Sequence, residues 1–335
     1  MRRHNFKHGK RGQTGLTLIE LMVALGIGAF LMIGAVTVFM QSRTSFRVTE
    51  SVSRLQENGR FVLDALEPDI RMARFWGLTT RTQKIANRAL PTAANGIGDD
   101  TCGNNWLINL EWAVEVRNNG NNFACAGAFP GQNETTADTL TIRRVSEDAV
   151  PVGALVANRM YVQAGRFLDG LIFDDGALPA GFVPGDGSET HALSVNGYYV
   201  SRSSSLGANI PSLRVHTLLG DGTVQDQEVL PGVEDMQIQF GVDTDVIGAV
   251  NRGSIDRYVN ADNAILDPLQ PGFLPDAEVL AVRIWLRLRA ENIENGFTDT
   301  AAYVYADRNQ VPFNDGFRRI VVSKTIYIRN ARQAS

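Results

Sequence analysis

The stretch "RGQTGLTLIELMVALGIGAFLMIGAVTVFMQ" (Arg11–Gln41) decides how this chain of 335 residues is built. From position 16 to position 40 the clearly polar residues are only Thr17, Glu20 and Thr37. As an α-helix rising about 1.5 Å per residue, this run can span a hydrocarbon layer about 30 Å thick. The sequence therefore predicts a membrane-spanning helix that carries one carboxylate, and an ionisable group at that depth is a functional hypothesis by default.

Basic residues are concentrated ahead of the apolar run. The first 15 residues hold five of the 32 Lys and Arg side chains and no acid, which leaves 27 basic against 36 acidic side chains beyond Gly15. The positive-inside rule then places the N-terminus in the cytoplasm and the remainder of the chain outside it. An acidic body without concentrated Lys and Arg is also poorly suited to binding nucleic acid.

Two simpler interpretations of the N-terminus explain less. A secretory signal peptide has an apolar core of about 7–15 residues followed by a small-x-small cleavage site. Here the core is longer, and no such site occurs in "VTVFMQSR" (Val36–Arg43). A plain signal anchor explains the length and the orientation of the segment, but it does not explain Glu20.

The motif "GLTLIELMVAL" (Gly15–Leu25) resembles the prepilin signature of type IV pilins and of the related type II secretion pseudopilins. In that family a basic leader ends in Gly, and a membrane-embedded prepilin peptidase cuts after the Gly and methylates the new N-terminus. The fifth mature residue is Glu. The resemblance implies a leader over residues 1–15, cleavage between Gly15 and Leu16, N-methylation of Leu16, and an assembly role for Glu20.

The position of Glu20 agrees with that role on physical grounds. It would lie one turn into the mature helix, where the helix dipole favours a carboxylate. It could pair with the α-amine of a neighbouring subunit. The low dielectric of the membrane strengthens such a pair, although desolvation offsets part of the gain. We therefore expect Glu20 to find its partner when subunits pack into a filament.

Five further segments resemble the PilW-type minor pilins, and they are spread over most of the chain, although residues 80–225 match only loosely. They are "LQENGRFVLDAL" (Leu55–Leu66), "DIRMARFWG" (Asp69–Gly77), "LPGVEDMQIQFGVDTD" (Leu230–Asp245), "VLAVRIWLRLRA" (Val279–Ala290) and "FRRIVVSKTIYIRN" (Phe317–Asn330). Minor pilins of this type are low-abundance structural subunits of the complex that initiates the pilus and sits at its tip. The resemblance thus implies a non-enzymatic subunit that primes pilus assembly for twitching, adhesion or DNA uptake.

The same resemblance implies partners and a location. The partners would be other minor pilins, the major pilin, the prepilin peptidase, the inner-membrane assembly platform and a large tip adhesin. The head would lie in the periplasm and then at the pilus tip. One alternative is a J-type minor pseudopilin of a type II secretion system, which shares the N-terminus and the helix-on-sheet plan. Another is a membrane-anchored binding module or hydrolase, outside any pilus, that keeps its first 15 residues.

A helical pattern continues beyond the membrane segment. Apolar or small residues recur at steps of three and four, at Val48, Val52, Leu55, Gly59, Val62, Leu66, Ile70 and Ala73. This spacing predicts one helix from Leu16 to about Met72, with Pro68 kinking or ending it nearby. We expect a transmembrane half over 16–40, an amphipathic half over 41–73, and a β-rich globular head over 74–335.

Six later segments are rich in β-branched and aromatic residues and partly alternate, which predicts strands at 138–145, 192–203, 212–219, 234–242, 278–290 and 318–330. In "AVRIWLRLRA" (Ala281–Ala290) Arg283, Arg287 and Arg289 share one face, which we interpret as solvated, or as stems packed along the sheet, rather than as an anion site. The predicted fold class is α+β and pilin-like, with the long helix on an antiparallel sheet and an enlarged, loop-rich head.

Cys102 and Cys125 both lie in an irregular region, 79–137. Outside the cytoplasm, two cysteines in such a region favour one disulfide, which would add on the order of 3 kcal/mol in the chain-entropy model. Two free or separately paired thiols are the alternative. A zinc site is disfavoured because the sequence places no histidine near either cysteine.

Asp243 and Asp245 have the alternating spacing with which calcium loops begin, and Asp256 could contribute from farther along. The residues that follow Asp245 are "VIG" instead of further acids, so calcium is only a weak candidate and a polar hairpin tip is the alternative. Two of the four histidines, His4 and His8, lie in the leader, and the other two, His191 and His216, lack paired metal spacing. No Gly-rich phosphate loop precedes a helix. The sequence therefore predicts neither a cofactor nor catalysis.

Overall fold

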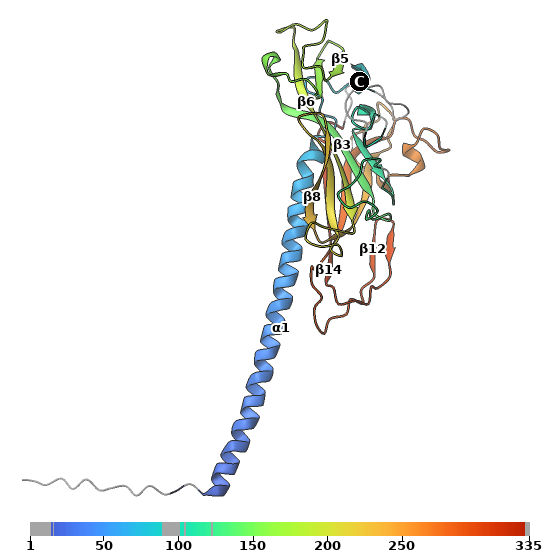
Figure 1. The fold of residues 1–335 in the computed structure, drawn as a ribbon. Coiled ribbons are helices and arrows are strands. Elements are labelled where there is room, and N and C mark those ends of the chain that lie inside the picture. Colours follow the sequence, from blue (N-terminus) through green and yellow to red (C-terminus); the bar gives the residue numbers. More distant parts are fainter. Residues whose placement is uncertain (1–14, 16, 89–100, 104, 122, 332–335) are drawn as a thin grey trace, which may run out of the picture. The chain divides into compact units, whose positions relative to one another are not determined.

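The structure is a computed structural model that describes residues 15, 17–88, 101–103, 105–121 and 123–331. It divides into two compact units, residues 1–53 and 54–335, and the boundary falls inside helix α1 (Leu18–Arg71). The first unit contains the first part of this helix. The second contains the last turns of the helix together with the strands (Figure 1).

The long N-terminal helix predicted from the apolar spacing is confirmed. It ends at Arg71, three residues beyond Pro68, whose carbonyl still accepts a bond of 3.0 Å from the N–H of Met72. Proline cannot donate to the preceding turn, and its ring crowds the carbonyl four residues earlier, so the helix ends soon after it. Arg74 then adopts a φ of 63°, which turns the chain away from the helix axis.

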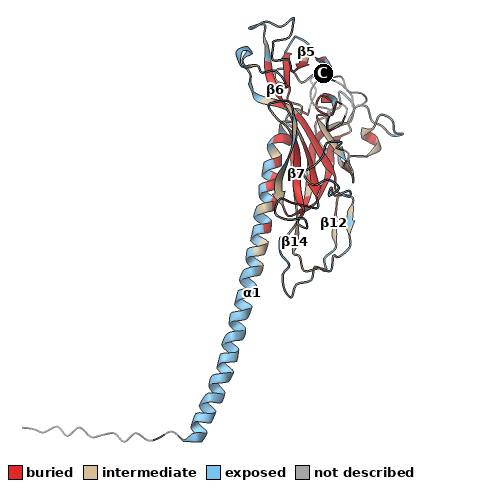
Figure 2. Ribbon diagram, in the orientation of Figure 1, coloured by how far each residue is buried: buried red, intermediate tan, exposed pale blue. Residues whose placement is uncertain are grey.

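The apolar stripe is buried only in the second unit. Leu55, Val62, Leu66 and Ile70 are each at most 3% exposed, whereas the side chains of residues 17–47 are exposed (Figure 2). Gly59 lies in the stripe where the helix packs tightly on Val322, because an added Cβ there would lie 2.9 Å from Cγ1 of that residue. A helix of this composition owes its stability to packing of the apolar face rather than to propensity.

The head contains two larger sheets where the sequence suggested one. The four-stranded sheet has the order β10-β9-β11-β14 and is antiparallel throughout. The eight-stranded sheet runs β1-β5-β4-β6-β3-β2, and β7 and β8 continue from the second half of β6. A two-stranded hairpin pairs β12 with β13. The one parallel pair among the described strands is β1 with β5.

All six predicted strand segments form strands. They are β3 (Thr139–Ala149), β6 (Ser188–Ser201), β7 (Ser212–Leu218), β9 (Val233–Asp243), β11 (Glu278–Arg289) and β14 (Arg319–Tyr327). The sequence analysis missed β1 (Ile85–Ala86), β2 (Val114–Arg117), β4 (Tyr161–Gly165), β5 (Gly170–Phe173), β8 (Val224–Pro231), β10 (Arg257–Asn260), β12 (Tyr303–Tyr305) and β13 (Arg308–Gln310). All of the missed strands except β8, which has eight residues, have five residues or fewer, so their alternation gives little signal.

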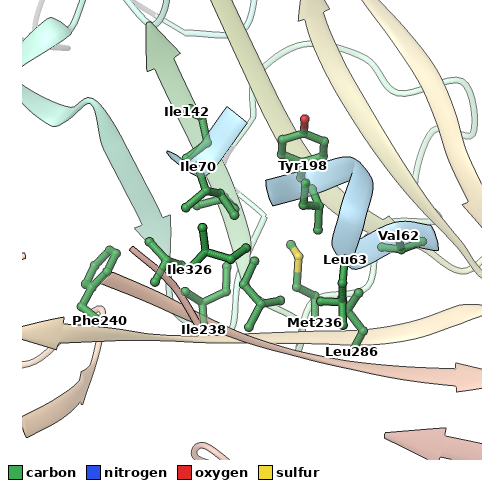
Figure 3. Packing of buried hydrophobic residues seen from close by; sticks show 14 of the residues in the cluster. Val62, Leu63, Ile70, Ile142, Tyr198, Met236, Ile238, Phe240, Leu286 and Ile326 are labelled. Carbon is green, nitrogen blue, oxygen red and sulfur yellow. The ribbon is translucent and has the colours of Figure 1, made fainter. Parts of the chain in front are cut away.

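The main core lies between the end of α1 and the two sheets. Val62, Leu63 and Ile70 of the helix pack in one cluster with Met236 of β9 and Leu286 of β11 (Figure 3). The alternation predicted for β11 is confirmed, because Val282, Ile284, Leu286 and Leu288 are all buried on the helix side. Each fully buried side chain of this size contributes about 1.5–3 kcal/mol.

The region expected to be irregular supplies a second core. Its described part forms little regular structure, yet Trp106, Leu107 and Ile108 are buried together with Trp76 and Ile85. This cluster packs against the eight-stranded sheet. The region therefore acts as a cover for one sheet face, which composition alone did not indicate.

Of the two interpretations offered for the arginine face of β11, the solvated one is wrong for Arg287, which is buried. Its side chain is only 6% exposed and lies 5.0 Å from the ring centre of Phe313, while Arg289 lies 4.1 Å from that of Phe317. Arg283 stacks on Tyr258 at 3.3 Å. Aromatic side chains from before and after β11 in the chain cover this face, and a guanidinium packs well against an aromatic ring.

Candidate functional site

The first turn of α1 is capped by its own sequence. The N–H of Glu20 donates to Oγ1 of Thr17 at 3.3 Å, and the N–H of Leu21 donates to the Thr17 carbonyl at 3.2 Å. A threonine followed three residues later by glutamate is the capping-box pattern. The sequence analysis missed this signal in "TLIE", which gives Glu20 a position in the first turn independent of any second subunit.

The processing residues are only partly within the described chain. Gly15 is exposed, with no atom within 4 Å of the position of an added Cβ. Leu16, the predicted site of cleavage and methylation, lies outside the described residues, as does the leader over residues 1–14. Cleavage after Gly15, methylation of Leu16 and the assembly role of Glu20 stay predictions.

The surface of α1 from Leu18 to Met40 is apolar and exposed. This helix is long and apolar enough to cross a membrane. The hydroxyl of Thr37 donates to the carbonyl of Gly34 at 2.8 Å, so this polar group is satisfied within its own helix, as a hydrocarbon environment requires.

Asp69 joins the last turn of α1 to the eight-stranded sheet. Its side chain is 10% exposed, and one oxygen accepts two bonds from Arg144 of β3 at 2.9 and 2.8 Å. The other oxygen accepts from Nδ2 of Asn196 and from the hydroxyl of Tyr198, both on β6 and both at 2.5 Å. A buried carboxylate with a cation and two further donors is fully satisfied, so this contact fixes the helix end to the sheet.

The environment of Asp69 also affects its neighbour. Burial, and then the negative charge of Asp69, raise the pKa of Tyr198 well above its usual value, so its hydroxyl remains a donor. A second, exposed contact ties the helix to β14, where Nζ of Lys324 lies 2.8 Å from Asp64 and 2.6 Å from Glu67. Hydrogen bonds to these two carboxylates raise the pKa of Lys324.

The opposite face of the four-stranded sheet carries a buried network of acids and arginines. Glu234 accepts from Arg287 at 3.2 Å and from Arg319 at 2.7 Å. Asp235, which is 0% exposed, accepts from the Tyr305 hydroxyl at 2.6 Å and from Arg308 at 3.0 Å. Because Tyr305 and Arg308 belong to β12 and β13, the network attaches that hairpin to the sheet.

The predicted disulfide is present between Cys102 and Cys125, with an S–S distance of 2.06 Å. The segment that it closes packs tightly on β6, because a Cβ at Gly197 would lie 2.8 Å from both Trp106 and Phe123. His216 lies within 4.8 Å of the two sulfur atoms. Sulfur atoms joined in a disulfide are not the thiolates that bind zinc, so this trio is a packing contact.

The structure brings the calcium candidates Asp243 and Asp245 together with Asp256, with oxygen atoms within 4.8 Å of one another. The carboxylates of Asp243 and Asp256 are already used in the loop, whereas Oδ2 of Asp245 is buried without a hydrogen-bond partner among the described residues. Asp243 accepts from the N–H groups of Asp245, at 2.9 Å, and of Gly253, and Asp256 accepts from the backbone and hydroxyl of Thr244 at 2.7 and 2.9 Å. Those bonds lower the pKa of Asp256. Loop closure explains the positions of Asp243 and Asp256, and calcium binding stays a prediction.

Comparison with known proteins adds two family matches. Residues 197–330 match the family described as type IV pilus-assembly protein W, and residues 10–36 match the prokaryotic N-terminal methylation motif. No curated protein matches the chain. Among solved structures, a type IV-like pilin from Thermus thermophilus is 14% identical, with a TM-score of 0.32, over 85% of this chain and 98% of that one.

Proposed function

We propose that this chain, which belongs to the PilW-type minor pilins, is a structural subunit of the complex that initiates type IV pilus assembly and remains at the pilus tip. The observation that carries the proposal is the combination of the two family matches: one covers most of the strands in the second half of the head, and the other covers the helix start. The family is one of structural pilins rather than of enzymes, and its N-terminus is that of a membrane-anchored pilin.

The proposed path of the protein follows from its parts. The leader over residues 1–15 is removed by prepilin peptidase, and Leu16 becomes the methylated N-terminus. Residues 16–40 anchor the subunit in the inner membrane with the head, residues 74–335, in the periplasm. The apolar, exposed surface of α1 supports this path, because it offers area for lipid before assembly and for other subunits after it.

Anchoring of the head to the helix supports a load-bearing role. Asp69 is held by three side chains from β3 and β6, and the apolar stripe of residues 41–73 is buried from Leu55 onward. A subunit that is extracted from the membrane through its helix must carry its head with it. The assembly platform, the major pilin, other minor pilins and a large tip adhesin are the proposed partners.

Two measurements test the proposal. The mass of the protein recovered from membranes should correspond to a chain that begins at Leu16 with one added methyl group, and a chain that still begins at Met1 would contradict it. Deleting the gene should remove surface pili and twitching while leaving enzyme secretion intact. Loss of secretion with normal pili would instead indicate a pseudopilin.

The role of Glu20 is tested by substitution. Glu20→Ala should leave cleavage after Gly15 intact but reduce incorporation into pili, because the carboxylate that pairs with an amine of a neighbouring subunit is gone. Glu20→Gln is the matched control for the capping box, since a glutamine can still bond to the N-cap backbone. If Glu20→Gln assembles like the wild type, the capping function is sufficient and the intersubunit ion pair is not required.

A further inference from the structure

Strand β2 leaves one edge of the eight-stranded sheet open. Among the described strands it pairs only with β3, with Val114 opposite Ile142 and Val116 opposite Leu140. The N–H of Arg143 donates to the carbonyl of Ala113, so in this antiparallel ladder the groups of Val114 and Val116 point away from β3. The outer edge of β2 therefore offers two N–H and two C=O groups for a further strand.

That edge faces a groove of about 1550 Å³. One wall is β2 with the residues around it, and the other is formed by residues 247–279, which lead from β9 to β11. The volume exceeds the roughly 300–1,000 Å³ that is usual for small-molecule pockets. The groove is therefore large enough for a polypeptide segment lying beside β2.

Some apolar side chains that line the groove remain exposed to solvent. Trp112, just before β2, is 46% exposed, and Ile247 on the facing loop is 71% exposed. Val246 and Val250, which flank the lining part of that loop, are 65% and 101% exposed. Exposed apolar residues gathered around a concave surface are typical of protein interaction sites.

The charged side chains of the groove determine which charge a bound segment should carry. Its lining holds three arginines and six carboxylates, namely Arg74, Arg117, Arg252, Glu111, Glu115, Asp262, Asp267, Asp276 and Glu278. The arginines are engaged within the head. Arg117 pairs with Glu115 at 3.4 Å, Arg252 pairs with Glu278 at 3.7 Å, and Arg74 donates to the Ala331 carbonyl at 2.8 Å.

Three of the acids remain unneutralised. Asp262, Asp267 and Asp276 have no ion pair with any cation in the described part of the chain. Asp262 is exposed, and the other two are half-buried. A carboxylate-rich groove of this kind favours a segment that carries lysine or arginine and disfavours an acidic one.

We infer that the groove beside β2 receives an extended, lysine- or arginine-bearing segment of another pilus subunit, which adds as a strand to the outer edge of β2. The main-chain bonds would come from Val114 and Val116, and the charge preference from Asp262, Asp267 and Asp276. This is the strand-addition mode of peptide recognition. It rests on the proposed function only in naming a pilus subunit as the source of the segment.

Val116→Pro is a selective test of the main-chain contact. The outward N–H of Val116 is not used by β3, so proline removes a donor for the incoming strand without removing a ladder bond of the sheet. Val116→Thr is the matched control, because it keeps the N–H and the β-branched shape. Both variants are compared with the wild type as full-length protein in detergent micelles, and near-ultraviolet circular dichroism checks that each is folded.

The probes are two labelled eight-residue peptides, one of alternating valine and lysine and the other of alternating valine and glutamate, measured by fluorescence anisotropy. We expect the lysine peptide to bind at least tenfold more tightly than the glutamate peptide. Val116→Pro should weaken its binding at least tenfold, whereas Val116→Thr should stay within about twofold of the wild type. Equal binding of both peptides, or equal binding to the proline variant, would overturn the inference.

A second variant covers the case in which Val116→Pro does not fold. Replacing Asp262, Asp267 and Asp276 by asparagine should weaken binding of the lysine peptide at least fivefold and should not weaken binding of the glutamate peptide. An unchanged preference between the two peptides would overturn the inference. Self-association of the full-length protein that Val116→Pro abolishes would assign the groove to a second copy and would also overturn it. The peptide assay needs no pilus, so it can fail while the deletion phenotype and the mature mass still support the proposed function.

Discussion

Replacing Asp69 by asparagine tests whether the buried carboxylate fixes the end of α1 to the sheet. Asparagine has almost the same shape but only one acceptor oxygen. Its NH₂ group would face either the two donor groups of Arg144 or those of Asn196 and Tyr198. Two charge-assisted hydrogen bonds are lost whichever way the amide is turned, and Arg144 loses its counter-ion.

The size of the effect follows from burial. Removing one partner of a buried ion pair costs about 3–5 kcal/mol. The Arg144 side chain is 21% exposed, so water can replace part of what it loses. We therefore expect the free energy of unfolding to fall by about 3 kcal/mol, toward the lower end of that range.

Urea unfolding of the full-length protein in detergent micelles, followed by tryptophan fluorescence, measures this change. With a slope of about 3 kcal/mol per molar urea, the midpoint should fall by about 1 M. Asp64→Asn is the matched control, since it makes the same chemical change on the same helix at a carboxylate whose side chain is 55% exposed. Its midpoint should change far less. Equal shifts in the two variants, or an unchanged midpoint in Asp69→Asn, would refute the assignment.

Three further predictions concern the head. Replacing Cys102 and Cys125 by alanine should lower stability by about 3 kcal/mol, and reductant should lower the melting temperature of the wild type but not of the variant. Burial raises the pKa of Asp138 to about 7, above its unfolded value of 3.8, so the folded state holds the proton more tightly. The free energy of unfolding should therefore fall as pH rises from 4 to 7. Asp138→Asn should remove this pH dependence from urea midpoints measured across the same range. Gly59→Leu should lower the free energy of unfolding by about 1–3 kcal/mol through overpacking against Val322. A urea midpoint equal to that of the wild type would show that β14 shifts to make room for the larger side chain.

The N-terminal helix could be predicted from local pattern. The apolar run, the three- and four-residue spacing and Pro68 all act within a few residues of one another, so they predicted α1 almost to its ends. Six strands of seven or more residues were found for the same reason, because alternation over that length is a local signal, although β8, with eight residues, was missed. The short strands, β2 among them, give too few residues for alternation to stand out.

The roles of polar residues could not be predicted, because their partners are distant in sequence. Asp69 looked like one of several charges on an amphipathic helix, yet its bond to Tyr198 joins residues 129 positions apart. Arg287 looked solvated because β12, β13 and Phe313, which cover it, come later in the chain. Pairing of a charge with a distant partner depends on how the elements pack, and periodicity within one element carries no information about it.

The sequence by itself determined the long apolar helix, the N-terminal methylation motif, the position of Glu20 in the first helical turn and the strand-rich head, since each follows from neighbouring residues and backbone geometry. Only the tertiary structure decided which carboxylates are buried and paired, how the segment closed by Cys102 and Cys125 covers a sheet, and that β2 has a free edge beside an acidic groove. Those features arise where separate elements meet, and the free energy of such contacts depends on burial and distance, which a linear pattern does not contain.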